Sequence, residues 1–209
     1  MKNILFTLAL LISFSSFGQT AKEYFSSGDD KAKANDHYGA IADYTKAIEL
    51  IPRPSSYNNR GLSKAELNDQ YGAIADYTKA IELDPNYDIA YYNRADSKAE
   101  LDDHYGAIAD YTKAIELDPN DASAYYNRAD SKAELKDHYG AIADITKAIE
   151  LDPNDASAYY NRADSKDELK DHYGAIADYT KAIELDPNYA SAYYNRGISK
   201  ADLNDNNGA

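Results

Sequence analysis

The chain has 209 residues, of which 44% are hydrophobic, with 21 Tyr, no Trp and no Cys. Its formal net charge of −14 disfavours binding to a nucleic-acid backbone, which requires clustered Lys and Arg, and equally disfavours anionic membrane surfaces. Basic proteins, metal ions and neutral glycans stay compatible with this charge, and a chain without Cys needs no disulfide in an oxidising compartment.

Residues 1–18 have the pattern of a secretory signal peptide. Lys2 precedes an apolar run over residues 4–12, and Ser16 and Gly18 are small residues at positions −3 and −1 of a cut before Gln19. The apolar run is short for a membrane span, although an uncleaved N-terminal anchor is the alternative. We therefore expect the mature chain to be periplasmic or secreted, without membrane insertion after cleavage.

One sequence then returns along the chain at a fixed interval. The segment YGAIADYTKAIELDP starts at Tyr71 and returns at Tyr105 and Tyr173, with one change in the copy at Tyr139. These copies are 34 residues apart, and the earliest copy, at Tyr38, lies 33 residues before Tyr71. A constant period of this length predicts an array of small units in place of a single closed globule.

The period divides the chain after the signal peptide (19–209) into units of similar length. They cover residues 21–53, 54–87, 88–121, 122–155, 156–189 and, as a partial unit, 190–209. The first unit is degenerate, as expected of a terminal cap. The last stops at the entry to its second half, so that it is either a capping helix or the break point of a longer array.

Each unit is predicted to be an antiparallel pair of helices. In residues 88–121 the second half carries apolar residues at the spacings of an amphipathic helix, and the first half follows the same spacing less strictly. Asp103 is a suitable N-cap for the second helix, Pro119 ends it, and Asn120-Asp121 can cap the next unit's first helix.

This unit resembles the tetratricopeptide repeat. The resemblance is carried by an aromatic residue, a small residue, Ala, an aromatic residue, Ala and Pro, here Tyr91, Ala95, Ala107, Tyr111, Ala114 and Pro119. It extends over essentially the whole chain after the signal peptide. It implies an all-α fold, a right-handed α-solenoid of stacked antiparallel helix pairs, in which the first helices line a concave face.

The chain departs from the family pattern at two positions of each first helix. An apolar residue is usual three positions after the first aromatic residue, but this chain has Arg60, Arg94, Arg128, Arg162 and Arg196. A Lys follows four positions later in each unit. We expect each Arg to meet the recurring acid of the second helix, at Asp76, Asp110, Asp144 and Asp178.

The resemblance also implies which side chains are exposed on the concave face. They are a Tyr, an Asn, an Asp and a Glu from each of three units: Tyr92, Asn93, Asp96, Glu100, Tyr126, Asn127, Asp130, Glu134, Tyr160, Asn161, Asp164 and Glu168. Such a surface suits an extended basic peptide or protein segment. The alternative is that the acids only keep a symmetric array soluble.

Other site chemistries find little support in the sequence. The recurring His37, His104, His138 and His172 are expected to be surface residues of turns, since each lacks a second ligand at metal-site spacing. No calcium loop, catalytic motif or phosphate-binding Gly loop occurs, and no cofactor is indicated.

The sequence therefore predicts a non-catalytic scaffold for protein or peptide partners. The first alternative is a truncated accessory repeat region of a longer envelope enzyme or transport component, and the second is a structural spacer. Ile145, where the other units have Tyr, is expected to be a tolerated apolar exchange.

Overall fold

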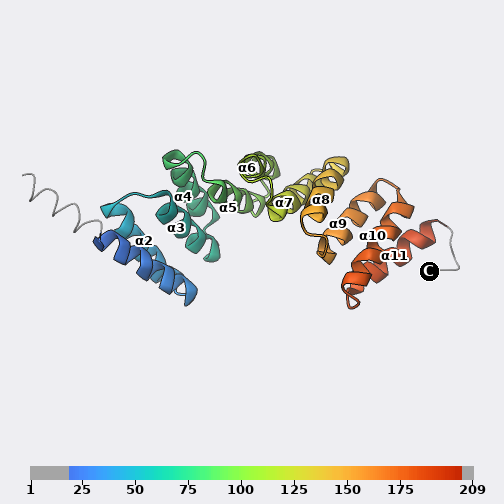
Figure 1. Ribbon diagram of the computed structural model, residues 1–209, viewed down its shortest axis with the longest axis horizontal. Helices are drawn as coiled ribbons and strands as arrows, with labels where there is room; N and C mark the ends of the chain where they lie inside the picture. The colour runs from blue at the N-terminus through green and yellow to red at the C-terminus, as the bar shows by residue number, and fades with distance from the viewer. Residues whose placement is uncertain (1–18, 204–209) are drawn as a thin grey trace, which may run out of the picture. The chain divides into compact units, whose positions relative to one another are not determined.

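The computed structural model describes residues 19–203, and all regular secondary structure in this range is helical (Figure 1). The predicted signal peptide lies outside the described residues. Residues 19–33 are helical. The helices that follow are α2 (His37–Leu50), α3 (Pro54–Glu66), α4 (Gln70–Leu83), α5 (Asp88–Ala99), α6 (His104–Leu117), α7 (Ala122–Glu134), α8 (His138–Leu151), α9 (Ala156–Glu168), α10 (His172–Leu185) and α11 (Ala190–Asp202).

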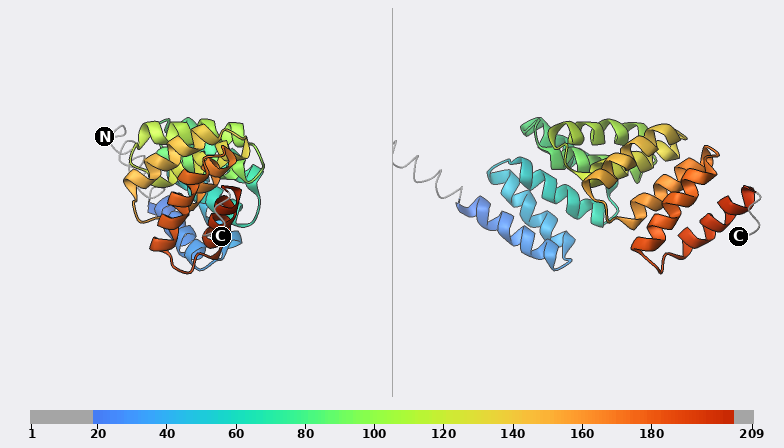
Figure 2. Two further views of the ribbon diagram at one scale, coloured as in Figure 1. Left: turned by 90° about the vertical axis from the view of Figure 1, so that its right-hand side faces the viewer. Right: turned by 45° about the vertical axis from the view of Figure 1, so that its right-hand side comes forward.

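These helices form two compact units. The N-terminal unit ends at Leu101 and contains the helix of residues 19–33 and α2 to α5, whereas the C-terminal unit begins at Asp102 and contains α6 to α11. Within each unit every helix packs against its neighbours in the sequence, as Figures 1 and 2 show. The first helices of successive repeats also touch, α3 with α5, α7 with α9 and α9 with α11. This is the predicted all-α array of stacked helix pairs.

The second helices start in the same way in every repeat. Their N-caps are Asp36, Asp69, Asp103, Asp137 and Asp171, whose carboxylates each accept a hydrogen bond from the backbone N–H of a Gly three residues later. This arrangement satisfies one of the free N–H groups at the helix start. The cap predicted at Asp103 is confirmed.

The residue three positions after each cap is Gly because the space beside it is too small for a side chain. A Cβ atom added to Gly140 would overlap the Asp137 carboxylate, and the equivalent glycines of the other repeats meet the same obstacle.

The residue just before each cap has a positive φ, between 59° and 65°. Asn or Asp occupies this left-handed position in three repeats and Lys in two, at Lys136 and Lys170.

The core between the helices consists mainly of Ala and Tyr. Ala residues at the crossing points, for example Ala129 and Ala141, have no exposed surface, which allows the helix backbones to approach closely. One Tyr of each second helix fills the space between a helix pair, at Tyr44, Tyr77, Tyr111 and Tyr179, each at most 2% exposed. Ile145 takes this place in α8 and is also buried.

The predicted pairing of Arg and Asp is confirmed for three of the five Arg residues, Arg60, Arg128 and Arg162. Arg128 on α7 donates from Nε and Nη2 to the two oxygens of Asp144 on α8, at 2.8 and 2.6 Å. Lys132 lies 2.7 Å from the same carboxylate. Arg128 Nη1 also donates to Thr112 Oγ1 on α6, the second helix of the preceding repeat, at 3.0 Å. One guanidinium therefore joins its own helix pair to the previous one.

The same arrangement recurs in both units. Arg60 pairs with Asp76, and Arg162 pairs with Asp178. In the first repeat, Ser27 stands at the Arg position and donates to Asp43 at 2.6 Å, beside Lys31 at 2.6 Å. The terminal repeat thus keeps the carboxylate and the lysine but replaces the bridging guanidinium with a short hydroxyl.

Candidate functional site

The twelve predicted binding residues all come from first helices or their last turn. Tyr92, Asn93 and Asp96 lie on α5 in the N-terminal unit, and Glu100 is its C-cap. The other eight lie in the C-terminal unit, four on α7 and four on α9. We call the surface formed by α7 and α9 the first-helix face of the C-terminal unit.

The expectation that all these side chains are exposed is wrong for the Tyr and Asn residues and for two of the Asp residues. The three Glu residues and Asp130 are exposed, whereas the Tyr and Asn residues, Asp96 and Asp164 are half-buried. Asn161 donates to the hydroxyl oxygen of Tyr126 at 2.7 Å, and Asn195 donates to that of Tyr160 at 2.9 Å. The Tyr and Asn side chains thus connect consecutive first helices, which leaves mainly the carboxylates for an outside partner.

Burial has a measurable consequence for these phenols. It raises the pKa of Tyr126 to about 12, assisted by the nearby Asp155 and Asp130. It also raises the pKa of Tyr160 to about 12, with Asp164 as the next cause. Both phenols are therefore neutral at physiological pH, when each accepts an Asn hydrogen bond.

Asp164 and Asp130 occupy equivalent positions but have different partners. The Tyr179 hydroxyl, 15 residues after Asp164, donates to its carboxylate, and Asn195 donates to the same oxygen at 3.1 Å. Fifteen residues after Asp130 stands Ile145, which has no hydroxyl. Asp130 makes no hydrogen bond or ion pair among the described residues. Although the side chain is exposed, partial loss of water around its carboxyl group, followed by repulsion from Glu134, raises the pKa of that group.

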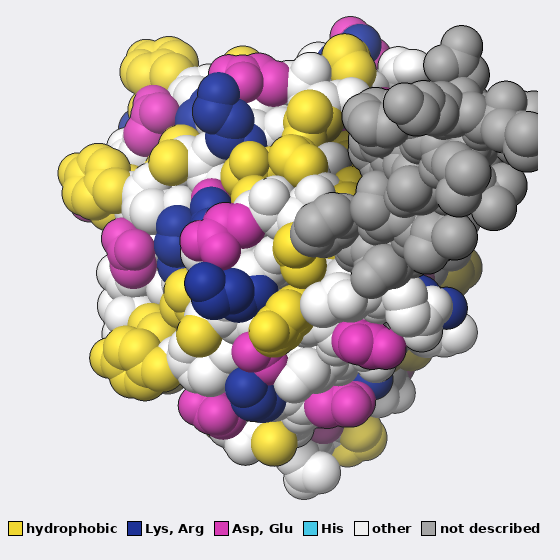
Figure 3. All heavy atoms as spheres, turned by 90° about the vertical axis from the view of Figure 1, so that its left-hand side faces the viewer, with side chains coloured by type: hydrophobic (Ala, Val, Ile, Leu, Met, Phe, Trp, Pro, Cys, Tyr) yellow, Lys and Arg dark blue, Asp and Glu magenta, His cyan; other side chains and the backbone are white. Residues whose placement is uncertain are grey.

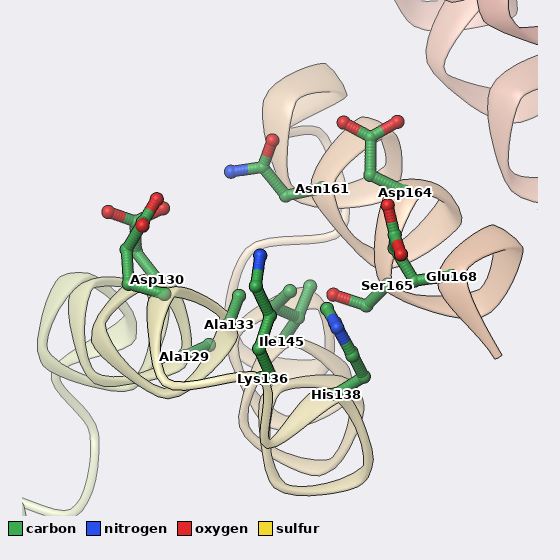
Figure 4. A pocket seen from close by; sticks show the side chains of 11 residues that line it. Ala129, Asp130, Ala133, Lys136, His138, Ile145, Asn161, Asp164, Ser165 and Glu168 are labelled. Carbon is green, nitrogen blue, oxygen red and sulfur yellow. The ribbon is translucent and has the colours of Figure 1, made fainter.

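A cavity of about 210 Å³ opens at this place between α7 and α9 (Figure 4). Figure 4 shows Ala129 and Ala133 of α7 on one side and Asp164, Ser165 and Glu168 of α9 on the other. Further lining residues are Asp130, Glu134, Lys136, His138, Ile145 and Asn161. The cavity brings together five of the predicted binding residues, namely Asp130, Glu134, Asn161, Asp164 and Glu168.

Its apolar lining was not foreseen from the sequence. From the sequence, Ile145 is only a tolerated apolar exchange for Tyr. The detectable signal was a 15-residue interval between an Asp of the first helix and a Tyr of the second, which three repeats keep. The second repeat lacks the Asp, with Leu62 before Tyr77, and the fourth lacks the Tyr, with Ile145 after Asp130. The resulting cavity has an apolar base, four carboxylates and one Lys.

The histidines do not lie on the surface of turns, as the sequence had suggested. Each is the first residue of a second helix and is partly buried. The Nδ1 atoms of His37, His104 and His138 are buried without a hydrogen-bond partner, whereas His172 Nδ1 lies 2.7 Å from Asp167 Oδ1. Within residues 19–203, no group of three or more His, Asp or Glu side chains is placed to hold a metal ion.

The remaining surface gives no sign of a basic patch in the view of Figure 3. Lys, Arg, Asp and Glu side chains are interspersed there, and single apolar side chains protrude between them. Across the described part of the chain, no helix combines the length and the apolar character that a membrane span requires.

Family models match most of the repeat array. A model described as TPR repeat matches residues 96–136 and 168–203, and three models described as tetratricopeptide repeat match residues 54–87, 122–155 and 145–177. Together the matched segments cover residues 54–87 and 96–203, more than half of the chain. No match was found among curated proteins.

Solved structures share the fold over most of their own length. A crystal structure of MamA protein is 26% identical, covers 83% of this chain and 96% of its own, and superimposes with a TM-score of 0.76. YrrB, described as a TPR protein with an unusual peptide-binding site, is 21% identical over 87% of this chain and 97% of its own, with a TM-score of 0.76. MamA 41-end from Desulfovibrio magneticus RS-1 is 21% identical over 81% and 97%, with a TM-score of 0.77.

Proposed function

The chain belongs to the tetratricopeptide repeat family, whose fold is that of a protein-interaction scaffold, and we propose that it is a non-catalytic scaffold binding a basic peptide or protein segment. The binding surface is the first-helix face of the C-terminal unit. The observation that carries this proposal is the cavity between α7 and α9, where Asp130, Glu134, Asp164 and Glu168 stand against a single Lys136.

The electrostatics of this face favour a cationic partner. Four carboxylates and one ammonium group leave a local charge of about −3, and Asp130 has no cation of its own. Complementary charge raises association rates and selects partners more than it raises affinity. The half-buried Tyr and Asn pairs, which join α7 to α9 and α9 to α11, hold this face in one arrangement before the partner arrives.

The peptide class is supported by a relative of the same fold. YrrB is described as having an unusual peptide-binding site. For the present chain the peptide is proposed to be extended and rich in Lys or Arg, because the acids follow one another along successive first helices at a 34-residue interval.

The test is the binding of purified residues 19–209 to an array of peptides that differ only in charge. We expect basic peptides to bind, and the binding to weaken with salt and to be lost when the exposed Asp130, Glu134 and Glu168 are all changed to Lys. The matched control changes Glu116, Glu150 and Glu184 to Lys. These acids are 59–61% exposed on the second helices and give the same change of net charge.

Two results would contradict the proposal. Equal loss of binding in the two triple variants would show that net charge alone attracts the peptides. Binding that prefers neutral or acidic peptides would exclude the first-helix carboxylates as the recognition element.

We further propose that the protein acts outside the cytoplasm. The proposal rests on the signal-peptide pattern of residues 1–18, and it predicts that the exported protein begins at Gln19. N-terminal sequencing of protein recovered from the envelope and the medium tests it. A chain that still begins at Met1 would favour the uncleaved anchor.

A further inference from the structure

The repeats differ in what occupies the space beneath the first-helix Asp. Tyr44 fills it in the first repeat and Tyr179 in the fifth, and the hydroxyl groups donate to Asp29 and Asp164, the first at 2.7 Å. Ile145 has neither the ring nor the hydroxyl, so that Asp130 lacks the planar donor that its counterparts have. The space is open to solvent as part of the cavity between α7 and α9.

We propose that this cavity is a subsite for one arginine side chain of the bound segment, whose guanidinium takes the place of the missing phenol and donates to Asp130. The inference rests on the proposed function and deepens it, because it assigns one residue of the partner to one place on the first-helix face.

The lining favours a guanidinium over an ammonium group. Ala129, Ala133 and Ile145 give the cavity apolar surface, and α7 contributes two acidic residues to its lining, Asp130 and Glu134. A guanidinium is planar, is less strongly hydrated than an ammonium group and presents several N–H donors in one plane. It therefore loses less hydration on apolar surface while it satisfies a carboxylate.

The N-terminal unit contains a comparison cavity with different properties. That cavity, of about 450 Å³, is lined by Asp29, Lys33, Glu66 and Tyr44 among others. Its Asp already accepts hydrogen bonds from Tyr44 and from Asn59, and Lys33 balances one of its two acids. Of these two cavities, only the one over Ile145 combines an Asp that has no hydrogen-bond partner with an excess of negative charge.

His138 adds an unused polar atom to the same cavity. Its Nδ1 is buried and has no hydrogen-bond partner, and the residue is part of the cavity lining. His37 Nδ1, in the lining of the comparison cavity, is buried without a partner in the same way, so this atom does not distinguish the two cavities.

The decisive variant is Ile145→Tyr. It restores the residue that the other second helices carry, so that the fold should be kept, with a melting temperature equal to or above that of the parent. The new hydroxyl should donate to Asp130 and fill the subsite. Asp130→Asn is a second variant, at an exposed position, which removes the charge without filling the space.

The first measurement uses a small probe, N-acetyl-arginine amide, with its neutral citrulline analogue as control. Methyl signals of Ala129, Ala133 and Ile145 in residues 19–209 report on the cavity by NMR. We expect the arginine compound, and not the citrulline compound, to shift them in the parent. In Ile145→Tyr the Ala129 and Ala133 signals should no longer respond. Signals that respond equally to both compounds, or do not respond, would overturn the inference.

The second measurement uses peptides that differ only by Arg or citrulline at one position. A charge-assisted hydrogen bond makes the Arg peptide bind the parent about tenfold more tightly. The ratio should fall below about threefold in Ile145→Tyr and in Asp130→Asn. An unchanged ratio in the variants overturns the subsite while peptide binding, and with it the proposed function, stands. If the probe occupies the cavity but no peptide binds, the proposed function fails and the subsite stands.

Discussion

Arg128 is placed inside the helix packing although the repeat family usually has an apolar residue there. Its guanidinium contacts Asp144, Thr112 and the ring of Tyr125, which lies 5.6 Å from Arg128 Cζ. The side chains of Arg128 and Asp144 are only 13% and 7% exposed. Burying two charges is unfavourable unless the pair is complete, so removing one partner costs more than the pair itself contributes.

Arg128→Leu is therefore expected to destabilise the protein by about 3 kcal/mol, at the low end for a broken buried pair because Lys132 still balances Asp144. Urea unfolding followed by circular dichroism measures the change. Lys147→Gln is the control, since it breaks an exposed pair with Glu150 and should cost less than about 1 kcal/mol. An Arg128→Leu variant as stable as the parent would exclude a stabilising role for the guanidinium.

At the scale of the helices, the Asp cap and the Gly three residues later act as one feature. Asp137 accepts from the backbone N–H of Gly140 at 3.0 Å, and its carboxylate occupies the space that a Cβ of residue 140 would need. Gly is otherwise unfavourable in the first turn of a helix relative to Ala. The cap therefore explains why every repeat keeps a residue of low helix propensity.

Gly140→Ala is expected to destabilise α8 by about 1 kcal/mol, because the methyl group displaces the capping carboxylate. In an Asp137→Ala background the same change should stabilise by about 0.5–1 kcal/mol, since only helix propensity remains. Thermal and urea unfolding of the four proteins measure this reversal of sign. The same sign in both backgrounds would disprove the steric explanation.

The helix contacts of α8 permit a second test at this scale. Ala148 is 4% exposed and lies where α8 packs against its neighbours. Ala148→Asp should unfold the surrounding repeats because an unpaired charge would enter an apolar contact. Lys147→Asp, one residue earlier on the exposed side, should have little effect. Hydrogen exchange of α7 to α9 reports the local loss. A variant that melts like the parent would contradict the stacking.

The helices and their caps could be predicted from the sequence because they depend on neighbouring residues. Asp103 and Gly106 interact across three positions, and the 34-residue period repeats this signal. The cavity could not be predicted in this way. It requires Ile145 of one helix, Asp130 of another and Glu168 of a third to be placed in space, and residue 145 differs from its counterparts by an exchange that keeps the core apolar.

The prediction that all twelve binding residues are exposed was wrong in part for a related reason. The sequence shows that Tyr126 and Asn161 recur, but their hydrogen bond joins two repeats and depends on the distance between α7 and α9. The Arg and Asp pairing was predictable, because two opposite charges at a constant 16-residue interval have few other ways to be buried.

For the molecule as a whole, stability is the sum of repeats and the contacts between neighbours. Buried Tyr residues contribute to many of these contacts. Burial raises the pKa of Tyr44, Tyr77 and Tyr179 strongly, and that of Tyr126 and Tyr160 to about 12. Phenols ionise near pH 10 in an unfolded chain. A raised folded pKa means that the stabilisation is complete below about pH 10 and is lost as the pH rises through about 12.

We therefore expect the melting temperature to fall by more than about 5 °C between pH 8 and pH 11.5. Loss of helical circular dichroism should coincide with the tyrosinate absorbance that appears last as the pH is raised, because the buried phenols ionise only when their repeats open. A melting temperature that does not change over this range, with tyrosinate forming in the folded protein, would contradict the role of the buried phenols.

The proposed function assigns peptide binding to the first helices of the repeats and not to the second helices. Both the first and the second helices carry exposed carboxylates. The exposed Glu residues of the second helices pair with a Lys three residues before them, as Glu150 does with Lys147, whereas Asp130 of the first helices has no such partner. The first and second helices therefore differ less in net charge than in whether their exposed carboxylates already have a cationic partner.

Amide hydrogen exchange of residues 19–209, with and without a bound basic peptide, tests this assignment most directly. Protection concentrated in α7 and α9, and absent from α8 and α10, is the predicted result. Protection that lies on the second helices, or is spread evenly over the array, would contradict binding by the first-helix face.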